Sequence, residues 1–363
     1  MTILQALLIV PLLLAALPAV PALAATTQPT EIQWHDGATF GIEGAGWTNE
    51  QSPYYRFPAS AQGKVSDAVW DLGQQSAGLC IRFVTDSKQV MVRWDLTGSN
   101  LAMPHMPATG VSGVDLYCRK RDGSWIFVKN GRPEKQAGNE MTTYLPGDRN
   151  PQAECMLYLP LYNGVKKLEI GVPTGRTIEK APARPEPKRE PIVYYGTSIA
   201  QGGCASRPGM AFTAIIGRAL DRPVINLGFS GSGRMESSVA DLLAELHPRV
   251  YVIACLWNMG NLSDDEFTQR LTTLISTIRK TNPVTPILFV GQSQIQIDSP
   301  PPGHEVLQEK VATGMHDANI HTLPGHDLMG FDGEGTVDGC HPNDLGMMRQ
   351  AQILIPVLEK LVR

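Results

Sequence analysis

Four polar residues in the second half of the 363-residue sequence have the types and the order that serine-based acyl chemistry requires. Ser198 and Asn258 each follow an apolar run typical of a buried strand, and Asp338 and His341 precede the last helical pattern. Acyl transfer needs an activated hydroxyl, a base, an acid that orients the base, and hydrogen-bond donors for the developing oxyanion. The four residues can supply this set if the fold brings them together.

A glycine-rich turn, 228–233, adds a source of backbone N–H donors between Ser198 and Asn258. Each feature alone has a plainer explanation, because a serine after a strand is commonly a turn or cap residue and Asn258 can close a turn. Asp338 can bind its own loop, and His341 can be a surface histidine. Their joint order along the chain favours the catalytic interpretation.

Strand and helix patterns alternate over the second half of the chain. The predicted strands are 192–195, 224–227, 250–256, 286–290 and 320–323, and the predicted helices are 210–220, 237–245, 264–280, 305–317 and 343–361. Such units predict an α/β fold with a parallel sheet covered by helices on both faces. Sites on these sheets form beyond the carboxyl ends of the strands, which is where the polar residues stand.

The first half has short strand patterns separated by turn signals and no long helical period. The predicted strands are 79–84, 90–94, 114–118, 125–128, 156–161 and 167–172. Many short strands with regular turns predict an antiparallel β-sandwich. The two halves meet at a run of alternating proline and charge, 181–191, which favours an extended, solvated connector. We therefore expect a sandwich over 25–180 and an α/β domain over 192–363.

Residues 1–24 are apolar, carry no charge and end in Ala22-Leu23-Ala24, the small-x-small pattern of a signal peptidase site. Three prolines interrupt the run and disfavour a long spanning helix. We expect a cleaved signal peptide, with an uncleaved anchor as the alternative. No later stretch approaches the roughly 20 apolar residues that cross a bilayer. A secreted or periplasmic protein without a stable membrane span is expected.

Composition narrows the function classes further. Apolar residues make up 42% and charged residues 18% of the chain, which suits a folded globular protein. The net charge of -4 comes with no basic stripe, which argues against a nucleic-acid partner. The sequence has no Walker-type phosphate loop, no nucleotide fingerprint and no Cys/His cluster with zinc spacing. We expect neither a metal nor an organic cofactor.

The four chemical blocks resemble those of the SGNH/GDSL hydrolase family. The matching residues are Gly196-Thr197-Ser198-Ile199, Gly231, Asn258, and Asp338 followed three residues later by His341. The resemblance implies that Ser198 is the nucleophile, His341 the general base and Asp338 its orienting partner. It also implies an oxyanion hole made by the backbone N–H groups of Ser198 and Gly231 and the amide of Asn258. Thr197 departs from the family pattern, because many relatives have Asp there, and so does Leu256-Trp257 before Asn258.

The first half resembles the companion domain that precedes one subgroup of these esterases, named for its Gly-x-Asp-Leu-Tyr motif. Gly113-Val114-Asp115-Leu116-Tyr117 fits that motif, and 159–165 fits a later strand of the same domain. The resemblance implies a jelly-roll-like sandwich ahead of a three-layer α/β/α esterase domain. It implies hydrolysis of acyl esters, most of all acetyl esters, on a carbohydrate. An acyltransferase with the same residues and a non-catalytic carbohydrate-binding protein are the alternatives.

Two further features are open at this stage. His105 lies in a Pro- and Met-flanked loop and is either a plain loop histidine or a residue that lines the substrate site. Cys204 follows Ser198 by six residues and Cys340 directly precedes His341, so a Ser198–His341 contact brings the two thiols close. They are either a disulfide, as an exported protein permits, or two buried free thiols.

Overall fold

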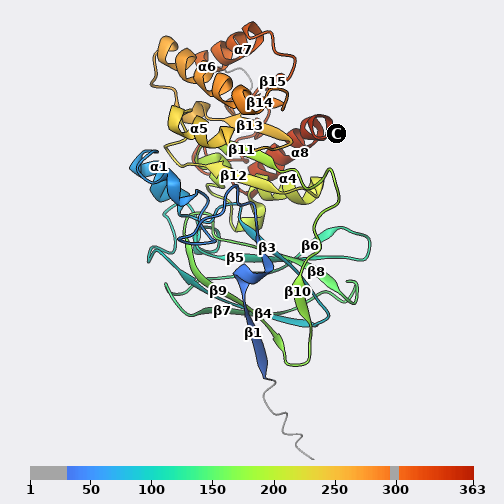
Figure 1. The fold of residues 1–363 in the computed structure, drawn as a ribbon. Helices are drawn as coiled ribbons and strands as arrows, with labels where there is room; N and C mark the ends of the chain where they lie inside the picture. Colours follow the sequence, from blue (N-terminus) through green and yellow to red (C-terminus); the bar gives the residue numbers. More distant parts are fainter. Residues whose placement is uncertain (1–30, 295–301) are drawn as a thin grey trace, which may run out of the picture. The chain divides into compact units, whose positions relative to one another are not determined.

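A parallel sheet of five strands forms the centre of the C-terminal half in the computed structural model, which describes residues 31–294 and 302–363 (Figure 1). The predicted signal peptide, 1–24, lies outside the described residues. The strand order is β12-β11-β13-β14-β15. The strands are β11 (Ile192–Gly196), β12 (Val224–Gly228), β13 (Val250–Ala254), β14 (Ile287–Val290) and β15 (Ile320–Leu323). The five strand predictions are confirmed with small differences at their ends.

Helices cover both faces of this sheet. They are α3 (Ser198–Gln201), α4 (Phe212–Leu220), α5 (Ser237–Ala244), α6 (Asp264–Thr281), α7 (Gly303–Gly314) and α8 (Asp344–Leu361). Successive side chains of a strand point to opposite faces. On β11, Val193 packs in the apolar cluster shared with α5 and α6, whereas Tyr194 packs in the cluster shared with α4 and α8 (Figure 1). The two helical layers account for the continuous apolar character of the strands.

Two antiparallel sheets make up the N-terminal half. One has the order β1-β9-β4-β7, and the other has the order β10-β3-β8-β5-β6 with β2 paired to β3. The strands are β1 (Ile32–Asp36), β2 (Ile42–Glu43), β3 (Cys80–Thr85), β4 (Gln89–Leu96), β5 (Val114–Arg119), β6 (Trp125–Gly131), β7 (Asn139–Tyr144), β8 (Ala153–Tyr158), β9 (Val165–Pro173) and β10 (Ile178–Lys180). Trp94 and Ile170 of the first sheet share one buried apolar cluster with Phe83 and Leu157 of the second.

Several elements of this half escape the sequence patterns. Strands β1, β7 and β10 and the short helices α1 (Asp67–Gly73) and α2 (Ala108–Val111) are not among the predicted elements. Strand β7 has a single apolar residue on its buried side, Met141, so its alternation is weak. Helix α1 begins at a Ser66 cap but is too short to show a clear helical period. None of the helices in the described ranges is long and apolar enough to cross a membrane.

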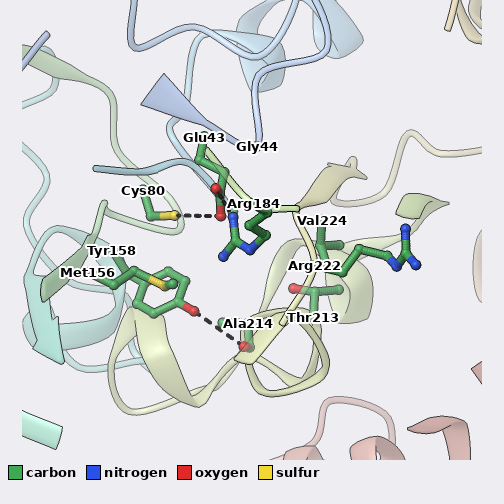
Figure 2. Close-up of a pocket in the computed structure, with 12 residues that line it drawn as sticks. Glu43, Gly44, Cys80, Met156, Tyr158, Arg184, Thr213, Ala214, Arg222 and Val224 are labelled. Carbon is green, nitrogen blue, oxygen red and sulfur yellow. Dashed lines mark hydrogen bonds and ion pairs between the residues drawn. The ribbon is translucent and has the colours of Figure 1, made fainter. Parts of the chain in front are cut away.

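The prediction of a solvated connector is wrong at Arg184, which is only 5% exposed. Its guanidinium pairs with Glu43 of β2 and with Asp221, which follows α4. Figure 2 shows Arg184 and Glu43 at a small cavity of about 20 Å³ whose wall also includes Thr213 of α4. A run of alternating prolines and charged residues predicts an extended backbone. It does not predict whether the fold buries one of the charged side chains beside a partner.

Arg184 belongs to a closed ring of three arginines and three carboxylates. Each arginine contacts two carboxylates: Arg82 contacts Glu43 and Glu154, Arg119 contacts Glu154 and Asp221, and Arg184 contacts Asp221 and Glu43. Four members lie on strands of the six-stranded antiparallel sheet, and Asp221 belongs to the α/β half. The ring therefore joins the two halves through partly buried charge pairs rather than through exposed ones.

Removing one cation from this ring should destabilise the fold measurably. We expect Arg184→Met to lower the free energy of unfolding by about 1–3 kcal/mol, because Glu43 and Asp221 each lose one of two arginine partners in a partly buried setting. Urea unfolding of the purified protein measures this. Arg132→Met is the matched control, since Arg132 is 72% exposed and its pair with Glu134 should contribute under about 1 kcal/mol. Equal effects of the two substitutions would contradict the buried role of the ring.

Candidate active site

The structure brings Ser198, His341 and Asp338 into one hydrogen-bonded line. Ser198 is the first residue of α3, directly after strand β11. Its Oγ lies 2.8 Å from His341 Nε2, and His341 Nδ1 lies 2.8 Å from Asp338 Oδ2. The turn from strand to helix is tight, because a Cβ on Gly196 would come within 2.8 Å of the Ala200 side chain. A serine, a histidine and a carboxylate in this order can activate the serine hydroxyl.

The Asp338 carboxylate is held by its own loop in the charged form. Its Oδ1 accepts the backbone N–H groups of Cys340 at 3.0 Å and His341 at 2.7 Å. Burial acts to raise the pKa of Asp338, but the hydrogen bonds from His341 and Cys340 outweigh it and lower that pKa to about 2. The carboxylate is therefore ionised at neutral pH and faces the imidazole as a fixed negative charge.

The glycine-rich turn and Asn258 lie against each other, and the turn also contacts the backbone just before Ser198. Gly231 has a φ of 66° and is exposed, and a Cβ added there would have open space around it. Asn258 ends a 3-10 turn after β13. Its Nδ2 lies 3.4 Å from the carbonyl oxygen of Phe229 and 3.3 Å from that of Gly233. These long contacts hold the amide against the turn that carries Gly231.

Asp115 of β5 holds the segment that follows α3, the helix that begins with Ser198. The side chain is fully buried, and its Oδ2 accepts hydrogen bonds from Arg207 Nη1 and from the backbone N–H of Gly209, both at 2.8 Å. Its Oδ1 accepts from Asn130 Nδ2 at 2.7 Å. Burial raises the pKa of Asp115, and these three partners act in the opposite direction. The sequence marks Asp115 only as a motif residue and gives no sign of its partners.

The same segment is tied to the histidine loop. Asp344, the first residue of α8, accepts the backbone N–H of Ser206 at 2.8 Å and its hydroxyl at 2.5 Å. Tyr162 OH donates to the backbone carbonyl of Ser198 at 3.1 Å. Neither Asp344 nor Tyr162 stands out in the sequence, because each acts through a partner that is remote along the chain.

His105 lies at the site rather than away from it. The centre of its ring is 5.9 Å from that of His341, and the side chain is exposed. The loop around it closes with paired backbone hydrogen bonds between Met103 and Met106. The interpretation of His105 as a loop histidine without contact to the site does not fit this position. A direct role for His105 in substrate binding stays a prediction.

Of the two alternatives for Cys204 and Cys340, the structure has the free thiols and not the hypothesised disulfide. Burial and the charge of Asp338 raise the pKa of each thiol to about 11, so neither forms the reactive thiolate readily at neutral pH. The loops that carry the two cysteines do lie close together, since a Cβ on Gly203 would come within 3.2 Å of the His341 ring. Across residues 31–294 and 302–363, no group of three or more His, Cys, Asp or Glu is placed to hold a metal ion.

Comparison with known families matches both halves of the chain. The model described as GDSL-like lipase/acylhydrolase family matches residues 189–359. The model described as the N-terminus of the SGNH-hydrolase-type esterases, which carries the Gly-x-Asp-Leu-Tyr motif in its name, matches residues 32–178. A comparison with curated protein sequences gives no match.

Solved structures with a similar fold extend over nearly the whole chain. A protein described as a GDSL-like lipase from Bacteroides ovatus is 33% identical with a TM-score of 0.78, over 92% of this chain and 98% of its own. The salicylyl-acyltransferase SsfX3 of a tetracycline biosynthetic pathway is 20% identical with a TM-score of 0.70, over 93% and 96%. A family two carbohydrate esterase from Cellvibrio japonicus is 12% identical with a TM-score of 0.57, over 92% and 98%.

The buried carboxylate of Asp115 offers a direct test of what holds this site in place. We expect Asp115→Asn to lower the free energy of unfolding by about 2–4 kcal/mol, because Arg207 loses its counter-charge and the Gly209 N–H loses a charged acceptor. Urea unfolding measures the change. Asp148→Asn serves as the control, since Asp148 is 59% exposed and its contact with Lys120 is long, at 3.8 Å. An Asp115→Asn protein as stable as this control would rule out the anchoring role.

Proposed function

The chain belongs to the GDSL-like lipase/acylhydrolase family and is an esterase, and on that premise we propose that Ser198 is its nucleophile, with His341 as general base and Asp338 as the residue that orients it. The observation that carries the proposal is the 2.8 Å separation between Ser198 Oγ and His341 Nε2. A base at that distance is within reach of the hydroxyl proton.

The reaction proceeds in two steps through an acyl-enzyme. Ser198 Oγ attacks the ester carbonyl while His341 Nε2 takes the hydroxyl proton, and the proton then passes to the departing alcohol. Water repeats the sequence on the acyl-serine and releases the acid. The ionised Asp338 keeps the proton of His341 on Nδ1 and stabilises the imidazolium that forms in each step.

The oxyanion that forms on the ester carbonyl is stabilised by three donors. Ser198 begins α3, and N–H groups in the first turn of a helix have no partner within it. Gly231 lies in an exposed turn, and the space where a Cβ on it would stand is open, which supports its N–H as the second donor. The Asn258 amide, positioned against that turn, is the third donor. Fixed donors of this kind commonly contribute more to acyl transfer than any other single group.

The substrate is an acyl ester, most of all an acetyl ester, of a carbohydrate. The fold is similar to that of solved carbohydrate esterases, among them the Cellvibrio japonicus enzyme. The proposal includes the finer fold, a jelly-roll-like β-sandwich over 25–180 and a three-layer α/β/α domain over 192–363, with 181–191 between them. Two antiparallel sheets with one shared core support the first, and helices on both faces of the parallel sheet support the second.

Export from the cytoplasm is part of the same proposal. The uncharged apolar run at 1–24 and its small-x-small ending support a cleaved signal peptide and a secreted or periplasmic enzyme. Mass spectrometry of the protein recovered from outside the cytoplasm tests this, since cleavage after Ala24 removes a defined mass from its N-terminus.

Acyl transfer to an acceptor alcohol is the second candidate function. It uses the same acyl-enzyme and replaces water by the acceptor, and a salicylyl-acyltransferase has the same overall fold. Product analysis with and without added sugar acceptors separates the two, because a transferase forms a new ester whereas a hydrolase forms free acid.

Removal of either central residue should abolish turnover without unfolding the protein. We expect Ser198→Ala to lower kcat on an aryl acetate by about 10⁴-fold or more, and His341→Ala to do nearly the same, because the members of such a group act as a unit. Circular dichroism checks the fold, and a fluorophosphonate probe should label the wild type but not Ser198→Ala. Near-normal esterase activity in purified Ser198→Ala would contradict the mechanism. A wild type that reacts with neither substrate nor probe would contradict it as well.

Substitution of Asn258 distinguishes its proposed role as an oxyanion donor from a purely structural role in closing its turn. We expect Asn258→Ala to lower kcat by about 10²–10³-fold with little change in KM, because the amide acts on the transition state. Its contacts of 3.3 and 3.4 Å to backbone carbonyls are long, so the melting temperature should change little. A large fall in melting temperature with normal activity per folded molecule would instead assign Asn258 to the turn.

A further inference from the structure

A polar hollow of about 440 Å³ opens in the N-terminal half next to the nucleophile segment. Three stretches of chain line it: the end of α1 and the residues after it, the loop that follows β4, and the loop between β8 and β9. The lining residues are Asp71, Gln74, Gln75, Thr97, Gly98, Ser99, Asn100, Tyr162, Asn163 and Gly164. Its volume lies within the range of about 300–1,000 Å³ that small-molecule sites occupy.

The lining is almost entirely neutral hydrogen-bonding groups. Amides and hydroxyls predominate, Asp71 is the single charged member, and no lysine or arginine lines the hollow. Such a surface suits the hydroxyl groups of an uncharged sugar, which both donate and accept hydrogen bonds. It does not suit a phosphate or a carboxylate, which require cations or several aligned N–H donors.

Part of this lining is held by its own hydrogen bonds, and two of its amide side chains have no partner among the described residues. Asn163 is buried and holds the β4 loop, because its Oδ1 accepts the Gly98 N–H at 2.9 Å and its Nδ2 donates to the Gly98 carbonyl at 3.0 Å. The side chains of Gln74 and Asn100 make no hydrogen bond with any described residue. A rigid wall with unpaired amides on its surface is the arrangement expected of a binding site.

Two of the lining residues connect the hollow to the reacting centre. Tyr162 OH donates to the backbone carbonyl of Ser198 at 3.1 Å. Gln75 Oε1 accepts a hydrogen bond from Gln201 Nε2, and Gln201 Oε1 accepts the backbone N–H of Ser230 at 3.0 Å, one residue before Gly231. The hollow therefore borders the nucleophile turn and is linked to the proposed oxyanion turn.

We propose that this hollow binds the sugar part of the substrate, an uncharged saccharide unit attached to or next to the acylated one. The inference rests on the proposed serine esterase function and adds to it the place where the N-terminal half recognises the carbohydrate. Gln74 and Asn100 form hydrogen bonds to sugar hydroxyls, and Tyr162 lies where the sugar meets the ester.

Kinetics on two substrates test this proposal. We expect Gln74→Ala and Asn100→Ala each to raise KM for an acetylated xylo-oligosaccharide about three- to tenfold, the effect of losing a neutral hydrogen bond. The values of kcat and KM for 4-nitrophenyl acetate, which has no sugar, should stay unchanged. Asn150→Ala is the matched control, because Asn150 is exposed in a loop outside the hollow and should change neither substrate's kinetics.

The outcomes separate the subsite from the esterase mechanism. Unchanged oligosaccharide KM in both variants overturns the subsite, and so does an equal rise for both substrates, which indicates a general distortion. A wild type that hydrolyses 4-nitrophenyl acetate but neither acetylated xylo- nor manno-oligosaccharides also overturns it, while the serine mechanism stands. Activity that persists in Ser198→Ala contradicts the proposed mechanism instead.

Discussion

The buried carboxylate of Asp115 is the constraint on which the position of the candidate site depends. A carboxylate without solvent contact is tolerated only when its oxygens have partners, and here Arg207, Gly209 and Asn130 supply them. Two of these partners lie on the segment that follows α3. Moving that segment away from β5 would leave the buried Asp115 carboxylate without its partners. The helix that begins with Ser198 is therefore held against the N-terminal half.

The segment that follows α3 also restricts the position of His341. Ser206 precedes Arg207 and is bound through its N–H and hydroxyl by Asp344, at the start of α8. The His341 loop leads directly into that helix, and the carbonyl of His341 accepts the Thr336 hydroxyl at 2.9 Å. The separation between Ser198 and His341 is thus set by a chain of charged and backbone contacts rather than by one loop, which is how a preorganised site holds its geometry.

The sequence predicts the parts of the site that depend on local order and misses those that depend on remote pairing. Parallel strands bring their carboxyl ends to one edge, so Ser198, Asn258 and His341 could be expected to converge from their places after strands or before the last helix. Arg207 pairs with Asp115 across 92 residues, and no local pattern reports such a pairing. The cysteines show the same limit, because proximity followed from Ser198 and His341, whereas the state of the thiols depends on burial and on Asp338.

The N-terminal half is therefore a structural part of the site rather than an attachment to it. It supplies His105 beside the imidazole of His341 and Tyr162, which donates to the Ser198 carbonyl, and its own apolar residues complete one face of the α/β half. Tyr158 and Leu161 share a buried cluster with Tyr194 and other residues of the parallel sheet and its helices. The α/β half alone would expose that apolar face and lose the partner of Arg207. Because burial of apolar surface drives folding, the two halves need each other for stability as well as for the geometry of the site.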